Sequence, residues 1–266
     1  MERINLKQAK RIVVKVGTST LTYDTSKLNY KRFDCIARVL ADLVNQGKEV
    51  ILVSSGAIST GVGKMHLSAK PESINEKQAV AAVGQCELMN VYARAFSNYN
   101  TLVAQLLLTN DVIENEVRKH NVTNTFITLL DRGIIPIVNE NDSVSTEEIN
   151  YENDMLSSIV AVLTDADLLI ILSDIDGLYN DNPKTNPNAV LIDKVYEVTD
   201  QLIEISGGSG SNRGTGGMRT KIKAADNAIK NGINTIITNG AEPDIIYDIL
   251  EGRAGVGTFF VGRKCE

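Results

Sequence analysis

Residues 33–57 have the sequence FDCIARVLADLVNQGKEVILVSSGA, and they contain the repeating unit of the fold that we predict. A helical pattern over Phe33–Gln46 ends at Gly47, because glycine readily adopts the backbone conformation that closes helices. The apolar run Glu49–Ser54 is typical of a buried strand in a parallel sheet. Small residues at 54–57 then open a second helix. The unit is therefore a helix, a glycine, a buried strand and a turn.

The same alternation continues along the chain. Six runs are predicted as buried parallel strands: Arg11–Val16, Glu49–Ser54, Leu102–Leu107, Ile134–Val138, Leu168–Leu172 and Thr235–Thr238. Two more helices with one apolar face precede a glycine and a strand: the segment before Gly133, with Val122, Phe126, Leu129 and Leu130, and Met218–Asn231, with Met218, Ile222, Ala225 and Ile229, before Gly232. The pattern predicts an α/β fold with a doubly wound sheet, whose ligands bind at the carboxyl ends of the strands.

Length and charge limit the function. A chain of 266 residues with 43% hydrophobic residues can form one large α/β domain and need not form two. The net charge of −6 disfavours nucleic acid and anionic membranes as partners, so an anionic substrate must be held by a few local cations and N–H groups. No apolar run approaches the roughly 18 residues that cross a bilayer, and none at the N-terminus suits a signal peptide. We therefore expect a soluble, cytoplasmic protein.

Several site types lack their usual residues. The three cysteines, Cys35, Cys86 and Cys265, are too far apart for a zinc site and do not suggest a disulfide framework. With only His66 and His120, a histidine metal site or a serine–histidine relay is not expected. Neither G-x-x-x-x-G-K-[ST] nor G-x-G-x-x-G after a strand is present, which disfavours Walker-type ATPases and nicotinamide oxidoreductases.

Lys15 lies within an otherwise apolar strand, in the segment VVKVGTST at residues 13–20. An unpaired buried lysine is costly, so we expect its ammonium group to emerge toward an anion near the strand end. Gly17 and the hydroxyl residues after it then provide a tight turn and donors. The alternative is an edge-strand lysine that faces water.

Two more polar segments follow predicted strands. The small residues of Ser54-Ser55-Gly56-Ala57 allow N–H groups at a helix start to approach an anion, although a plain serine N-cap is the alternative. Residues 139–154, NENDSVSTEEINYEND, form a carboxylate-rich segment that could capture an ammonium group. The alternative there is a solvated acidic loop, and with either interpretation Asn153 and Asp154 are expected to cap a helix over Met155–Leu163.

The fourth candidate pairs LSDIDGLY at residues 172–179 with GTGGMRTK at residues 214–221. The first ends a buried strand with two aspartates, and the second supplies glycine N–H groups, a helix start and Lys221. Together they could hold the phosphates of a nucleotide, although each alone could be a turn. The glycine-rich window 205–217 is predicted to be a mobile loop, with a flexible linker without function as the alternative.

These motifs resemble those of the glutamate 5-kinases in the amino-acid kinase family. KVGTS, SSGAI, VNEND, Asn153-Asp154, LSDIDGLY and GTGGMRTK occur in that family's order and approximate spacing, from Ile12 to Phe260. Parts of them are also similar to aspartokinase, acetylglutamate kinase and uridylate kinase, and NEND with GTGGM-x-TK narrows the resemblance.

The resemblance implies one amino-acid kinase domain over residues 1–266, a three-layer α/β/α sandwich around a mostly parallel sheet. A substrate-binding part covers about 1–165 and an ATP-binding part about 166–266. The implied reaction is phosphorylation of the γ-carboxylate of L-glutamate to L-glutamyl 5-phosphate, the first step of proline biosynthesis.

The resemblance also implies the roles of individual residues. Lys15 and Lys221 stabilise the transferring phosphoryl group, and Asp154 organises these lysines. Ser55, Asp142 and Asn153 contact glutamate, with backbone donors at Gly56 and Ala57. ATP contacts Lys15, Gly17, Ser173, Asp174, Thr215, Gly216, Gly217, Met218, Arg219, Thr220 and Lys221. Mg²⁺ arrives bound to ATP, with few or no ligands from the protein.

The chain departs from the family pattern in two places. Glutamate 5-kinases often have G-D-N-D before the next helix, whereas this chain has Glu152 in place of the aspartate and is one residue shorter there, which puts a substrate contact at that position in question. Many members also carry a C-terminal PUA domain, and this sequence matches a form without it. Inhibition by proline and a homo-oligomer, a dimer or a tetramer, are further implications of the resemblance.

The chemistry fits this resemblance. A glutamate γ-carboxylate, with a pKa of about 4.3, is ionised at neutral pH and needs no general base. Phosphoryl transfer instead requires positioning and charge stabilisation, which two lysines and N–H groups supply. Two alternatives remain: a family member with another acceptor, such as acetylglutamate, aspartate or UMP, and a catalytically silent amino-acid sensor. The two lysines and the glycine loop argue against a sensor.

Overall fold

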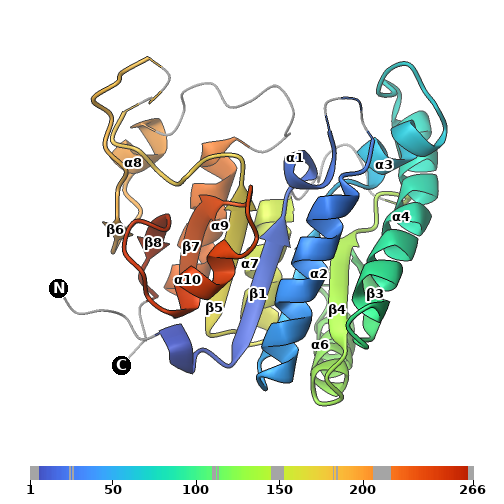
Figure 1. Ribbon diagram of the computed structural model, residues 1–266, viewed down its shortest axis with the longest axis horizontal. Helices are drawn as coiled ribbons and strands as arrows, with labels where there is room; N and C mark the ends of the chain where they lie inside the picture. Colours follow the sequence, from blue (N-terminus) through green and yellow to red (C-terminus); the bar gives the residue numbers. More distant parts are fainter. Residues whose placement is uncertain are drawn as a thin grey trace.

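An eight-stranded sheet runs through the protein, with helices on both of its faces (Figure 1). The computed structural model describes residues 6–23, 25, 27–109, 112, 114–144, 153–181, 183, 185–205 and 217–262. The strands are β1 (Arg11–Val16), β2 (Glu49–Ser54), β3 (Val103–Leu108), β4 (Ile135–Glu140), β5 (Leu168–Ser173), β6 (Lys194–Val195), β7 (Asn234–Asn239) and β8 (Thr258–Phe260). Their order in the sheet is β3-β4-β2-β1-β5-β7-β8-β6.

The sheet is mostly parallel, as predicted. The six strands from β3 to β7 in this order all pair in parallel. Among the strands in the described residues, only β8 pairs antiparallel to its neighbour β7, and β6 then lies parallel to β8. The carboxyl ends of the six parallel strands therefore meet at one edge of the sheet, where an α/β fold binds its ligands.

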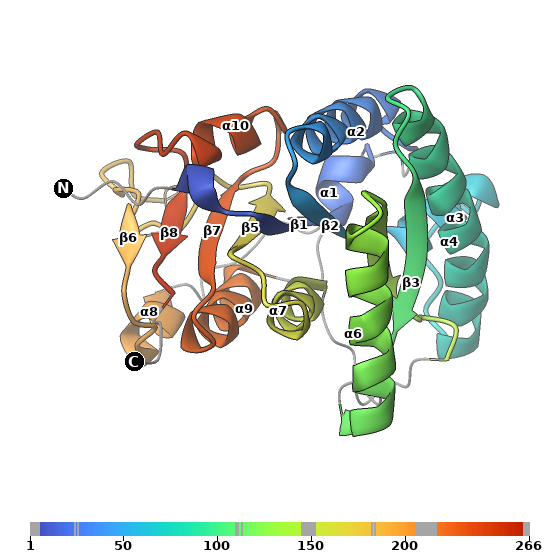
Figure 2. The ribbon, with the colours of Figure 1, turned by 90° about the horizontal axis from the view of Figure 1, so that it is seen from below.

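Helices cover the two faces and complete the three-layer sandwich (Figure 2). The helices and the short 3-10 turn are η1 (Leu6–Gln8), α1 (Thr18–Leu21), α2 (Tyr30–Asn45), α3 (Ala57–Lys64), α4 (Ile74–Ser97), α6 (Glu116–Leu130), α7 (Asn153–Leu163), α8 (Asp200–Ile205), α9 (Met218–Lys230) and α10 (Ile245–Leu250). One core lies between the sheet and α2, α4 and α10, and the other between the sheet and α6, α7 and α9. Successive residues of β1 alternate between them, since Val14 packs in the first core and Val13 in the second.

The element boundaries differ slightly from those predicted. Two predicted strands, Leu102–Leu107 and Ile134–Val138, are shifted, and occupy Val103–Leu108 and Ile135–Glu140. The glycines after the three predicted helices, Gly47, Gly133 and Gly232, all have positive φ, which confirms them as helix stops. The short strands β6 and β8 were not predicted, and neither was the 24-residue helix α4. Within the described residues, no helix is both long and apolar enough to span a membrane.

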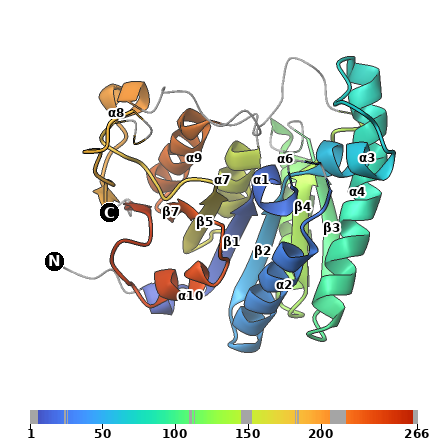
Figure 3. The same cartoon turned by 45° about the horizontal axis from the view of Figure 1, so that its top comes forward.

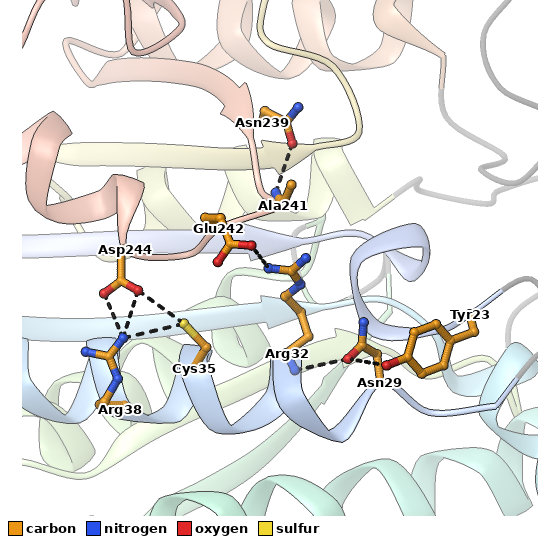
Figure 4. Close-up of polar contacts among 9 residues, drawn as sticks. All are labelled: Tyr23, Asn29, Arg32, Cys35, Arg38, Asn239, Ala241, Glu242 and Asp244. Carbon is orange, nitrogen blue, oxygen red and sulfur yellow. Dashed lines mark hydrogen bonds and ion pairs between the residues drawn. The ribbon is translucent and has the colours of Figure 1, made fainter.

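The segment after β7 contacts helix α2 through Glu242 and Asp244 (Figure 4). Nη2 of Arg38 on α2 lies 2.7 and 2.8 Å from the two carboxylate oxygens of Asp244, and Arg32 forms an ion pair with Glu242 at 3.5 Å. At the other end of the segment, the Gly240 N–H donates to the Ser173 carbonyl at 2.8 Å. The segment therefore links the end of β5 to helix α2.

Candidate active site

Two lysines share one buried carboxylate at the carboxyl edge of the sheet. Nζ of Lys15 lies 2.5 Å from Oδ1 of Asp154, and Nζ of Lys221 lies 3.0 Å from Oδ2. The three residues are 5%, 2% and 7% exposed, in the order Lys15, Asp154, Lys221. The cluster carries a net charge of +1 and is buried, so it is suited to an additional anion.

The strand pairing explains why Lys15 is there. Strand β1 is central, since Lys15 is level with Val53 of β2 and Ile171 of β5. The structure therefore excludes the alternative of an edge-strand lysine in water. Lys15 lies two residues after Val13 and shares its face of the sheet, which α7 and α9 cover. Figure 3 shows α7 and α9 side by side near this edge of the sheet.

Asp154 is held in its ionised form by the lysines. Burial of the carboxyl group raises its pKa, but the positive charges of Lys15 and Lys221 outweigh burial and hold the pKa of Asp154 at about 2. Oγ1 of Thr220 also donates to Oδ2 of Asp154 at 3.0 Å. Asp154 therefore fixes the ends of β1 and α9 relative to each other.

The predicted cap at Asn153-Asp154 was wrong. Helix α7 begins at Asn153, so both residues belong to its first turn. Their side chains point to the site instead: Asp154 contacts the lysines, and Nδ2 of Asn153 donates to Oγ of Ser55 at 3.0 Å. The other end of this amide, Oδ1, is buried and accepts no hydrogen bond from the described residues. A buried acceptor of this kind is available to an ammonium group.

Ser55 also leads into the start of α3. Gly56 is the N-cap of this helix, with a φ of 106°, and it has no side chain with which to cap the first N–H groups. Ala57 begins the helix. The helix predicted to open after residues 54–57 is confirmed, and N–H groups at such a helix start are suited to an anion.

Asp142 lies in the turn after β4, where its carboxyl group is half-buried. Burial raises the pKa of Asp142 to about 6. A carboxylate that is costly to ionise is stabilised by an added positive charge, so it favours an ammonium ligand. Residues 145–152 of the acidic segment, which include Glu152, lie outside the described residues.

The predicted nucleotide residues lie at the same edge. Ser173 ends β5 and its hydroxyl donates to the exposed Asp174 at 3.2 Å. A Cβ added at Gly17 would lie 3.5 Å from Nζ of Lys15, which puts this turn directly beside the lysine. Gly217, Met218, Arg219, Thr220 and Lys221 form the start of α9. Thr215, Gly216 and most of the predicted mobile loop 205–217 lie outside the described residues.

Sequence reasoning missed a second layer of residues around this edge. Nδ2 of the buried Asn139 donates to Oε1 of Gln85 on α4 at 2.9 Å. Next to it, Gly84 is so close to α3 that an added Cβ would lie 1.8 Å from the carbonyl oxygen of Ala57. The signal that could have indicated this contact is a glycine inside a helical pattern.

Comparison with known proteins identifies the family. A model of the amino acid kinase family matches residues 10–239. Two solved structures share the fold at 17% identity: UMP kinase from Bacillus anthracis, with a TM-score of 0.65 over 96% of this chain and 97% of that one, and carbamate kinase from Giardia lamblia bound to AMP-PNP, with a TM-score of 0.66 over 97% and 100%.

Three curated relatives are much more similar, and all are named glutamate 5-kinase. They come from Clostridium perfringens (58% identical, 98% of each chain covered), Enterococcus faecalis (52%, 97% of each) and Listeria innocua (51%, 99% of this chain and 97% of the relative). The chain therefore belongs to the amino acid kinase family, and within it to the glutamate 5-kinases.

Proposed function

We propose that this protein transfers the γ-phosphoryl group of ATP to the γ-carboxylate of L-glutamate, forming L-glutamyl 5-phosphate in the first step of proline biosynthesis. The observation that carries this proposal is the buried cluster of Lys15, Asp154 and Lys221 beside the Asn153–Ser55 hydrogen bond. In this arrangement, the proposed site for the transferring phosphoryl group adjoins the proposed site for the amino acid. The names of the relatives support the choice of glutamate.

In the proposed reaction, an oxygen of the γ-carboxylate attacks the γ-phosphorus, and the bond from that phosphorus to the β–γ bridging oxygen breaks. ADP leaves with the bond's electron pair, and no proton has to be removed from the nucleophile. Lys15 and Lys221 lie on both sides of Asp154 and stabilise the charge on the transferring oxygens. Asp154 keeps the two ammonium groups together without neutralising both.

Glutamate is bound by groups that complement its charges. The proposed acceptors for its ammonium group are the carboxylate of Asp142 and Oδ1 of Asn153. Ser55 and the N–H groups of Gly56 and Ala57 at the start of α3 are the proposed donors to a carboxylate. These residues lie in the N-terminal part, about 1–165, which we propose is the substrate-binding part.

ATP is bound by the C-terminal part, about 166–266, and by Lys15 and Gly17. Ser173, Asp174 and the start of α9 are its proposed contacts. The described residues contain no group of three or more His, Cys, Asp or Glu that could hold a metal ion, and Asp154 is already paired with two lysines. As the resemblance implies, Mg²⁺ would arrive bound to the phosphates of ATP, where it would neutralise part of their charge.

Three further expectations follow from the resemblance and are part of the proposal: the enzyme works in the cytoplasm, forms a homo-oligomer, and is inhibited by proline. If proline binds to the same residues as the substrate glutamate, its inhibition will be competitive with glutamate. Initial rates at several proline concentrations test this point.

The experiment that tests the function is ATP consumption by the purified protein with Mg²⁺ and one of glutamate, aspartate, acetylglutamate or UMP. Hydroxylamine traps an acyl phosphate as a hydroxamate. We expect hydroxamate with glutamate at a rate well above that with the other acceptors. Turnover with another acceptor alone would refute the substrate, and no turnover with any of them would favour the amino-acid sensor.

A further inference from the structure

Gln85 is a buried amide of α4 whose donor group has no partner in the part of the chain that the structure describes. Gln85 is only 8% exposed. Oε1 accepts a hydrogen bond from Asn139, but Nε2 donates to none of the described residues. Leaving a buried donor unpaired costs as much as removing a hydrogen bond.

The neighbouring contacts fix which end of the amide is unpaired. The N–H of Glu140 donates to Oδ1 of Asn139 at 2.9 Å, so the other end of the Asn139 amide must be its donor. That donor requires an acceptor at Gln85, which identifies the atom facing Asn139 as Oε1. The unpaired atom of Gln85 is therefore an N–H₂ group, which suits an anion and not a cation.

Gln85 lies where two parts of the proposed glutamate site meet. Through Asn139 it contacts the end of β4, which leads to Asp142. Through Gly84 it adjoins Ala57 at the start of α3, which follows Ser55. Because the contact of Gly84 with the Ala57 carbonyl leaves no space for a Cβ, the position of Gln85 relative to α3 is fixed.

We propose that Nε2 of Gln85 donates to the α-carboxylate of the bound amino acid. This inference rests on the proposed function. The lysine cluster is the place for the γ-carboxylate, while Asp142 and Asn153 are acceptors for the ammonium group. The α-carboxylate is the remaining charged group of glutamate, and Gln85 adds a side-chain donor for it to Ser55 and the N–H groups at the start of α3. Gln85 then selects acceptors that carry a carboxylate next to their amine.

Two variants test the proposal with the full-length protein. Gln85→Met removes both ends of the amide, whereas Gln85→Glu keeps the acceptor for Asn139 and replaces the donor by a negatively charged acceptor. We expect both to raise the KM for glutamate roughly tenfold to a hundredfold, the range for a hydrogen bond to a charged group, while the KM for ATP stays within about twofold. Asn90→Leu, at an exposed amide of the same helix, is the control and should leave both constants unchanged.

4-Aminobutyrate distinguishes this role from a general distortion of the site, because it is glutamate without the α-carboxylate. Its inhibition constant against glutamate should be the same in the wild type and in Gln85→Met, which adds no charge. An equal loss of affinity for 4-aminobutyrate, or an unchanged KM for glutamate, would overturn the role of Gln85, and the second result is expected if Nε2 only binds a buried water. A wild-type protein that does not phosphorylate glutamate would overturn the proposed function as well. Thermal unfolding of each variant shows whether it is folded.

Discussion

At the scale of single residues, the buried charged side chains identify the candidate site more clearly than its loops do. Lys15 could be recognised in the sequence because a lysine interrupts an apolar strand, and the structure pairs it with Asp154 and Lys221 from two other elements. The position of Asp154 could not be derived from local pattern alone. Its type and place suggested a helix cap, but the two buried ammonium groups attract its carboxylate more strongly than backbone N–H groups at a helix end.

Lys221 is expected to contribute to the chemical step and not to glutamate binding. Lys221→Ala should lower kcat by roughly a hundredfold to a thousandfold, because the lost charge stabilises mainly the transferring phosphoryl group. The KM for glutamate should change much less. Steady-state kinetics of the variant test this, with Lys223→Ala, at an exposed position of the same helix, as the control. An unchanged kcat would remove Lys221 from the mechanism.

Asp142 should make glutamate binding sensitive to acid. Burial raises the pKa of Asp142 to about 6, so its carboxylate gains a proton as the pH falls through 6 and loses its attraction for the ammonium group. The KM for glutamate should therefore rise below pH 6. In Asp142→Ala the KM should be high at all pH values, without this rise. A variant with the wild-type KM and pH profile would contradict the assignment.

At the scale of elements, the sequence predicted the bounds of those strands whose residues are mostly apolar and buried. Buried strands such as β1 and β2 have the predicted bounds, because continuous β-branched runs suit only the centre of a parallel sheet. Helix α4 was missed because Gly84 and Gln85 interrupt the apolar residues of its buried face, such as Leu88 and Phe96. The strands β6 and β8 have two and three residues, too few to show a period.

The crossing of α3 and α4 should tolerate no side chain at Gly84. In Gly84→Ala the new Cβ would lie 1.8 Å from the backbone oxygen of Ala57, so the helices must separate. We expect a loss of stability of about 1–3 kcal/mol, the usual cost of overpacking, and a raised KM for glutamate because the start of α3 moves. Thermal unfolding and kinetics check this. The adjacent Val83→Ala, on the exposed side of α4, should change neither by comparable amounts, and a stable Gly84→Ala with normal KM would refute the tight crossing.

At the scale of the whole molecule, the order of the strands explains why the site has two halves. Strand β1 lies at the centre, with β2 and β4 on one side and β5 and β7 on the other. The residues proposed to bind glutamate therefore lie on one side of Lys15, and those proposed to bind the nucleotide lie on the other. The sequence predicted a mostly parallel sheet with ligands at its carboxyl edge. It did not predict this strand order, because pairing between strands distant along the chain depends on contacts that no local pattern records.

The central claim is that both substrates meet at the cluster of Lys15, Asp154 and Lys221. The most direct measurement is a crystal structure of the protein with glutamate, Mg²⁺ and a non-hydrolysable ATP analogue. We predict that the γ-phosphoryl group lies within hydrogen-bonding distance of Nζ of both lysines and faces the γ-carboxylate of glutamate. Glutamate or the triphosphate bound away from this cluster, with neither lysine in contact with the γ-phosphoryl group, would contradict the account.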